Sequence, residues 1–260
     1  MGGISVKSAL VTDRGFENDR RWMLVDEHNR FISQREVAEM ALLEVTITDA
    51  GLTVRKKGRH SSVMIPFKPQ TNEFAEVIIW DDQCPAQFVS PEADLWFKNT
   101  LGINCRLVYM PDSSFRATEA EYTPTGYLTS LSDGYPFLLV GQASLDDLNK
   151  HLSEPLPMGR FRPNIVFTGG EAFAEDLMKS ITIGDILFNG VKLCARCPVT
   201  TIDQDTGERG KEPLKLLSAY RKRNNKVYFG QNLIHDGAGT ISLGDEIHVL
   251  QFNDEERFFI

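Results

Sequence analysis

The feature with the clearest chemistry is a pair of cysteines, Cys194 and Cys197, separated by Ala195 and Arg196. A cation beside a thiol favours the thiolate, which is the form that attacks electrophiles and binds metals. The pair therefore predicts a reactive thiol or a metal ligand. It follows a predicted strand pair and stands directly before Pro198, whereas a thioredoxin-like dithiol stands at a helix start after a βαβ pattern.

A metal held by this segment would take few ligands from the protein. A closed structural zinc site needs four, and the sequence offers neither a second cysteine pair nor a cluster among its five histidines. A soft metal that arrives on an organic cofactor needs only one protein thiolate. The residue types leave several metals open, and a cofactor-borne soft metal fits them better than zinc.

Two other segments carry groups suited to a binding site. Arg160-Phe161-Arg162-Pro163-Asn164 places two guanidinium groups and an amide at the start of a predicted strand. Guanidinium groups bind phosphate and carboxylate well, although arginines paired inside the protein are the competing interpretation. The aromatic and amide residues of 228–233 either line a pocket or form ordinary core and turn.

The composition limits the classes of partner. The chain of 260 residues is 42% hydrophobic and 25% charged, with a net charge of -8 and a pI of about 5.2. This acidity argues against a broad nucleic-acid surface, although local arginines can still bind an anion. No apolar run approaches the roughly 18–20 residues of a membrane helix, and the N-terminus lacks a signal-peptide core. We therefore expect a cytoplasmic protein without membrane association, with Cys84 and Cys105 as buried thiols.

Alternating apolar and polar residues in the first half predict strands. Hairpins are expected over 21–35 and 43–54, and a further strand over 76–80. Ser90 and Pro91 predict a helix start, with Leu95, Trp96 and Leu101 on its apolar side and Gly102 at its end.

The second half is predicted to mix strands with short helices. Ser144 and the acidic residues after it form a capping pattern, and Asn189-Gly190 indicates a hairpin within 181–191. A helix is expected over 212–221 and a last strand pair around Gly244-Asp245. Residues 111–127, rich in Pro, Ser, Thr and Gly, predict a linker between two halves.

The order and spacing of these motifs resemble one family. The matching segments are Ser132-Asp133-Gly134-Tyr135-Pro136-Phe137, Arg160 to Ile165, Cys194 to Cys197, Asp203 to Gly207, Glu212-Pro213-Leu214 and Phe229-Gly230-Gln231. Together they resemble the MOSC domain (molybdenum cofactor sulfurase C-terminal). In the first half, 19–26 and Ser33-Gln34-Arg35 resemble the MOSC N-terminal β-barrel domain. The architecture is similar to that of amidoxime-reducing and hydroxylaminopurine-resistance reductases.

The resemblance implies a fold and its division. It predicts a mainly β (α+β) protein with short helices, in which an N-terminal β-barrel-like domain precedes a MOSC β-barrel domain. The implied boundaries are 1–110 for the first domain, 111–127 for the linker and 128–252 for the MOSC domain. By this comparison the chain lacks a first strand and two cofactor contacts, and this loss would weaken cofactor binding. A native start upstream of Met1 would explain it.

The resemblance also implies site residues. Cys197 takes the role of molybdenum ligand and catalytic residue, with Cys194 left structural. Asp203 is either a second catalytic residue that orients a metal-bound water or a turn-capping aspartate. The remaining implied contacts to the molybdenum cofactor, its phosphate and its pterin ring fall on Arg20, Arg35, Asp133, Gly134, Tyr135, Arg162, Asn164, Ala195 and Arg196.

The implied function is a molybdenum-dependent reductase of N-hydroxylated small molecules, supplied by an external ferredoxin-like, cytochrome or flavoprotein donor. Two alternatives stay open: a sulfur or cofactor carrier with a persulfide on Cys197, and a non-catalytic ligand-binding module. Pyridoxal phosphate enters descriptions of the family through one sulfurase with a separate domain, and no such domain is evident in this sequence.

Overall fold

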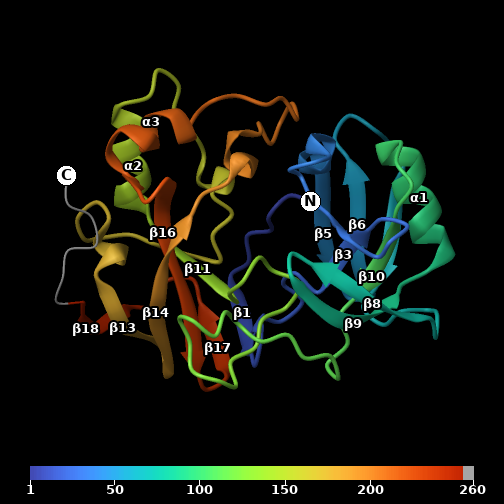
Figure 1. Ribbon diagram of the computed structural model, residues 1–260, viewed down its shortest axis with the longest axis horizontal. Coiled ribbons are helices and arrows are strands. Elements are labelled where there is room, and N and C mark those ends of the chain that lie inside the picture. Colours follow the sequence, from blue (N-terminus) through green and yellow to red (C-terminus); the bar gives the residue numbers. More distant parts are fainter. Residues whose placement is uncertain (254–260) are drawn as a thin grey trace.

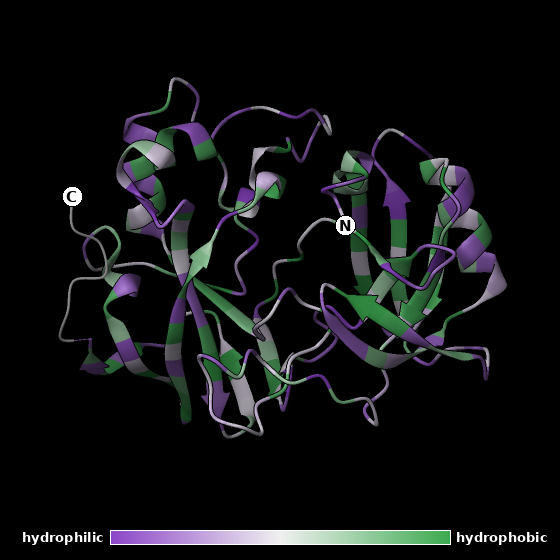
Figure 2. Ribbon diagram, in the orientation of Figure 1, coloured by the Kyte–Doolittle hydropathy of each residue, from purple (hydrophilic) through white to green (hydrophobic). Residues whose placement is uncertain are grey.

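Two lobes lie side by side in the computed structural model, which describes residues 1–253 (Figure 1). Strands dominate both lobes and the helices are short, so the predicted mainly β fold with short helices is confirmed. The central strands are largely hydrophobic, whereas the connecting loops carry many hydrophilic residues (Figure 2). Within the described residues, no helix is long and apolar enough to span a membrane.

The first lobe contains two antiparallel sheets and one helix. The five-stranded sheet has the order β4-β3-β10-β9-β8, with β3 (Trp22–Val25), β4 (Phe31–Ile32), β8 (Phe74–Ile79), β9 (Asp82–Phe88) and β10 (Arg106–Tyr109). The three-stranded sheet comprises β5 (Leu43–Thr48), β6 (Gly51–Lys56) and β7 (Ser62–Pro66), preceded by the 3-10 helix η1 (Ala38–Leu42). The predicted hairpins β3–β4 and β5–β6 and the strand β8 are therefore confirmed.

Helix α1 (Pro91–Leu101) begins and ends as predicted. The Ser90 hydroxyl accepts a hydrogen bond of 3.1 Å from the Ala93 amide, and Gly102 ends the helix with a left-handed backbone. The predicted apolar side was partly wrong. Leu95 is 60% exposed, and Phe97 is fully buried in the core of this lobe, because the helical spacing that faces the core is 93, 97 and 101.

The second lobe is built on a curled sheet with the strand order β12-β11-β16-β14-β13-β18. Its strands are β11 (Phe137–Gly141), β12 (Ile165–Phe167), β13 (Met178–Ile183), β14 (Ile186–Ala195), β16 (Lys226–Asp236) and β18 (Ile247–Phe252), with β15 (Lys222–Arg223) paired to β16. A small sheet of β1 (Ser8–Thr12), β2 (Gly15–Phe16) and β17 (Gly239–Ser242) completes it. Residues near the N-terminus thus pair with a strand close to the other end of the chain.

The helices of the second lobe are α2 (Gln142–Lys150) and α3 (Leu214–Tyr220), with the 3-10 helices η2 (Met158–Arg160), η3 (Ala174–Asp176) and η4 (Pro198–Thr201). The predicted helix over 212–221 is confirmed. Ser144 does not cap α2, because the helix begins at Gln142; its hydroxyl instead donates to Glu175 at 2.7 Å in the interior.

One predicted turn of the second lobe was misplaced, and one predicted strand pair was wrong. The β13–β14 turn falls at Gly184-Asp185, and Asn189-Gly190 lies within β14. Around Gly244-Asp245 the chain does reverse, but β17 pairs with β1 and β18 pairs with β13. In the second case contacts distant in sequence, rather than turn propensity, determine the pairing.

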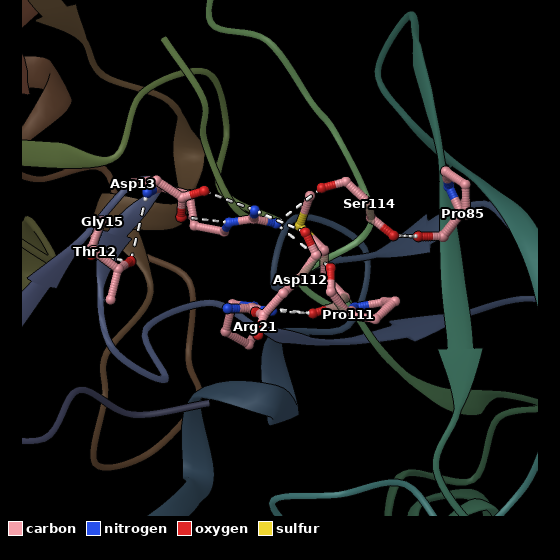
Figure 3. A network of polar contacts seen from close by, with 10 residues as sticks. Thr12, Asp13, Gly15, Arg21, Pro85, Pro111, Asp112 and Ser114 are labelled. Carbon is pink, nitrogen blue, oxygen red and sulfur yellow. Dashed lines mark hydrogen bonds and ion pairs between the residues drawn. The ribbon is translucent and has the colours of Figure 1, made fainter.

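Two arginines bind residues 110–114, the start of the segment that crosses from the first lobe to the second. Arg14, which is 3% exposed, follows β1 and donates to the carbonyls of Asp112 and Ser114 at 3.1 and 2.9 Å. Arg21, just before β3, donates to the Met110 carbonyl and to the Asp112 carboxylate (Figure 3). Because buried guanidinium groups must satisfy their donors, these contacts hold the crossing segment in one conformation.

Candidate functional site

Five of the predicted site residues come from three connections that meet between the lobes. Arg20 lies in the turn before β3, Arg162 and Asn164 lie between η2 and β12, and Arg196 and Cys197 lie between β14 and η4. Sheet pairing accounts for the last two, because Ala195 pairs with Tyr228 at the end of β14 and the Arg196 amide donates to the Val227 carbonyl at 2.7 Å.

Asp19 ties the first two connections together. Its Oδ2 accepts hydrogen bonds from the Arg20 guanidinium and, at 2.7 Å, from the Asn164 side-chain amide. Arg20 also donates to the backbone carbonyl of Arg162 at 3.1 Å, while Asn164 Oδ1 accepts from the Leu138 amide at 3.1 Å. Arg20, Arg162 and Asn164 therefore form one hydrogen-bonded cluster. Asp19 was not predicted from the sequence. The only signal for it is its position directly before Arg20, which was predicted.

This cluster is strongly electropositive. Burial and the neighbouring cation of Arg20 lower the pKa of Arg162 to about 10, with Arg196 acting in the same direction. The Met1 amine lies beside the same cations, and burial together with Arg162 and Arg20 lowers its pKa to about 4. The Met1 carbonyl accepts a hydrogen bond of 2.8 Å from Arg162. Positive charge gathered away from water in this way favours an anion.

Arg196 and the first cysteine are joined directly. Arg196 donates to Cys194 Sγ at 3.0 Å and to the Phe161 carbonyl at 2.6 Å, and its guanidinium lies over the Phe161 ring. The Cys194 thiol thus already has a hydrogen-bond partner, the Arg196 side chain. Both cysteines of the motif are half-buried and free of a disulfide, whereas Cys84 and Cys105 are buried, as predicted.

Cys197 faces an arginine from the other lobe. The Arg35 guanidinium donates to Asp133 Oδ2 at 3.0 Å and lies close enough to the Cys197 side chain for the two to interact. Burial lowers the pKa of Arg35, but the Asp133 carboxylate and the Cys197 thiol raise it above its ordinary value on balance. Trp80 covers the guanidinium at 4.5 Å and was not anticipated from the sequence. The contact places a cation of the first lobe beside the Cys197 thiol.

Asp203 lies in a tight turn. Its Oδ1 accepts the amides of Asp205 and Thr206 at 2.8 and 2.9 Å, and its Oδ2 accepts from buried Arg160 at 2.6 Å. The two backbone hydrogen bonds lower the pKa of Asp203, with Arg160 adding to the effect. These contacts favour the turn-capping interpretation of Asp203.

Gly134 and Tyr135 face a different group of residues. A side chain at Gly134 would meet Glu119 at 2.9 Å, and Lys192, which pairs with Glu119, lies 5.4 Å from the centre of the buried Tyr135 ring. The structure therefore links Asp133 to Cys197 through Arg35, but it joins the next two residues to Glu119 and Lys192.

Buried polar atoms without partners lie in the same segments. Among the described residues these include Arg196 Nε and the side-chain Nε2 and Oε1 atoms of Gln34. Gln34 lies next to Arg35 and is only 5% exposed. Buried polar groups are normally satisfied, so such atoms point to a partner of another kind. The described residues hold no group of three or more His, Cys, Asp and Glu side chains suited to a metal ion. One thiol, several cations and unsatisfied donors fit an anionic cofactor that carries its own metal ligands.

Comparison with known proteins agrees with this arrangement. Residues 1–104 match the family described as the MOSC N-terminal beta barrel domain, and residues 127–248 match the MOSC domain. The chain is 31% identical to mitochondrial amidoxime-reducing component 1 of Mus musculus, covering 95% of this chain and 78% of that protein. The chain therefore belongs to the MOSC family.

Two further relatives show the range of the family. Mitochondrial amidoxime-reducing component 1 of Homo sapiens is 29% identical over 95% of this chain and 79% of its own length. Molybdenum cofactor sulfurase of Oryza sativa subsp. japonica is 28% identical over 88% of this chain, which spans only 30% of that protein. The family is thus one concerned with the molybdenum cofactor.

Proposed function

We propose that this protein is a molybdenum-cofactor-dependent oxidoreductase that reduces N-hydroxylated small molecules with electrons from a separate protein. The observation that carries the proposal is the half-buried Cys197 thiol in contact with Arg35, at the edge of the cationic cluster. The similarity to amidoxime-reducing components supports the substrate class.

Each residue of the cluster has a separate task in this proposal. Arg20, Arg162 and Arg196 hold the anionic phosphate and pterin of the cofactor by charge and hydrogen bonding. Cys197 supplies the single protein thiolate for the metal, and Arg35 lies beside it as a neighbouring cation. When bound, the cofactor supplies a metal that changes oxidation state and accepts oxygen. Asp203 and Arg160 fix the loop behind Cys197.

The decisive experiment compares the protein with its Cys197→Ser and Cys194→Ser variants after anaerobic purification. Molybdenum, pterin and the reduction of an N-hydroxylated base by reduced methyl viologen are measured for each. We expect Cys197→Ser to lose the metal and the activity, and Cys194→Ser to keep both, because Cys194 is occupied by Arg196. A Cys197→Ser protein that retained molybdenum and turnover would refute the assignment.

Mass spectrometry of the same samples separates the sulfur-carrier alternative. A persulfide on Cys197 in protein that contains no pterin would favour a carrier over a reductase. Pterin and molybdenum in equal amounts, with an unmodified thiol, are the result expected for the proposed enzyme.

A further inference from the structure

A strongly basic segment follows the cysteine motif in an otherwise acidic chain. Residues 209–226 contain seven Lys and Arg but one acidic residue, Glu212, for a net charge of +6. The whole chain has a net charge of -8, so the rest carries -14. Charge this concentrated creates a local field of opposite sign to that of the molecule.

Most of these cations are exposed and form no ion pair in the part of the chain that the structure describes. Four lysines are exposed and form no ion pair with the described residues. They are Lys211 on the loop before α3, Lys215 on α3 itself, and Lys222 and Lys226 on the β15–β16 hairpin. Helix α3 stands at the top of the second lobe, and the loop that leads to it extends toward the first lobe (Figure 1). The cations are spread along a surface rather than converging, which suits a large charged partner better than a small anion.

Two cations face each other across the β15–β16 hairpin. Arg223 and Lys226 are directly opposite each other in the two-residue ladder of β15 and β16. Like charges at opposed positions destabilise a strand pair. Asn224 and Asn225 both have positive φ and make the tight turn that brings these cations together.

The basic segment is continuous with the site. The Val227 carbonyl, next to Lys226, accepts the backbone amide of Arg196, and Tyr228 pairs with Ala195. At its other end, Arg209 donates to the backbone carbonyl of Arg35 at 2.7 Å. The segment is therefore anchored beside the site by Arg209 at its start and by Val227, the residue that follows its end.

We propose that residues 209–226 form the docking surface for an acidic electron-transfer protein, which delivers its electrons next to Cys197. The inference rests on the proposed reductase function, since only an enzyme with an external donor needs such a surface. Charge complementarity to an acidic partner would raise the association rate and orient the donor, and both effects weaken with salt.

The test uses the cofactor-loaded full chain with two probes, an acidic [2Fe–2S] ferredoxin and an acidic soluble b-type cytochrome domain. The Lys222→Glu/Lys226→Glu variant is compared with a matched control, Lys7→Glu/Lys179→Glu, which changes the charge equally at exposed positions outside the segment. We expect the first variant to weaken Kd for at least one probe about tenfold or more at low salt, and the control to stay within about twofold. The difference should shrink between about 0.02 and 0.3 M salt.

Two readouts separate docking from folding and from chemistry. The Lys226→Glu change places a carboxylate opposite Arg223, so the thermal midpoint of the first variant should not fall, whereas its binding should. Turnover with reduced methyl viologen, which needs no docking, should be unchanged. Absent turnover with this donor in every protein would count against the enzyme itself.

Several results would overturn the docking proposal while leaving the reductase intact. They are viologen-driven turnover with no binding of either probe, equal loss of binding in the control variant, or binding only to duplex DNA.

Discussion

The Arg20 guanidinium donates a hydrogen bond of 3.1 Å to the backbone carbonyl of Arg162, a residue 142 positions away. Both residues have left-handed backbones, with φ of 50° and 55°. Such conformations cost about 1–3 kcal/mol each in residues other than glycine and persist where the surroundings impose them. The two strained turns therefore present a single cationic surface drawn from both halves of the chain.

Replacing Arg162 should separate cofactor binding from stability. Its lowered pKa indicates that the cation is disfavoured in the absence of a bound anion, because burial and Arg20 oppose the charge more than Asp19 and Asp133 favour it. We expect Arg162→Met to lose most pterin from the purified protein, yet to raise the thermal midpoint of the cofactor-free protein. Each kcal/mol of relieved repulsion corresponds to about 2–4 °C in a chain of this size.

The control for this prediction is Arg59→Met, because Arg59 is exposed on the turn after β6. It should change neither the pterin content nor the midpoint. A cofactor-free Arg162→Met protein that melted well below the parent would show that Arg162 supports the fold rather than an anion site.

Local patterns predicted most of the elements but not all of their partners. The hairpins β3–β4 and β5–β6 and the ends of α1 follow from alternation, turn residues and capping. The prediction of a turn at Asn189-Gly190 was wrong. The pair has strong turn propensity, but Gly190 is needed inside a strand for another reason. A Cβ there would lie 2.3 Å from the Met178 carbonyl and closer still to the Gln231 amide. The glycine allows a close approach between strands, which no local pattern reveals.

The site was predictable where its residues belong to motifs and not where distant contacts complete it. From chemistry alone, the arginines of 160–164 indicated either an anion or pairing inside the protein, and the cysteines of 194–197 indicated a reactive thiol or a metal ligand. Asp19 and Trp80 were missed, because their partners Asn164 and Arg35 lie 145 and 45 positions away in the sequence. Only tertiary packing, between distant segments for Asp19 and within the first lobe for Trp80, makes an ordinary aspartate and an ordinary tryptophan part of the site.

Gly190→Ala tests the close approach directly. The added methyl group would overlap the Gln231 side chain, which itself donates to the Met178 carbonyl at 2.7 Å, and the backbone of β13 cannot move freely. We expect a loss of about 2–4 kcal/mol in the free energy of unfolding, measured in urea. Gly159→Ala is the control, since nothing lies within 4 Å of a Cβ at that position, and it should change stability by less than about 1 kcal/mol.

Substitution of Asp203 distinguishes a structural from a catalytic aspartate. Asp203→Ala removes the acceptor of two backbone amides and leaves Arg160, which is 7% exposed, without its carboxylate. We expect it to lower the free energy of unfolding by about 2–3 kcal/mol. Asp203→Asn keeps the turn and should cost less. If Asp203→Asn instead abolished turnover at unchanged cofactor content and stability, the residue would be catalytic.

His235 should make stability depend on pH. Burial lowers the pKa of His235 below its ordinary 6.5, against the opposing influence of Asp236 and Asp13. The ring packs edge-on against Phe137, and its Nδ1 has no partner among the described residues.

The folded state therefore binds this proton less readily than the unfolded chain, and stability must fall as the pH drops below about 6.5, toward the lowered folded-state pKa. We expect the urea midpoint of the parent to decrease over this window and that of His235→Gln to decrease less. Because His248 is exposed on β18, His248→Gln should follow the parent curve. Parallel curves for the parent and His235→Gln would assign the acid sensitivity to other groups.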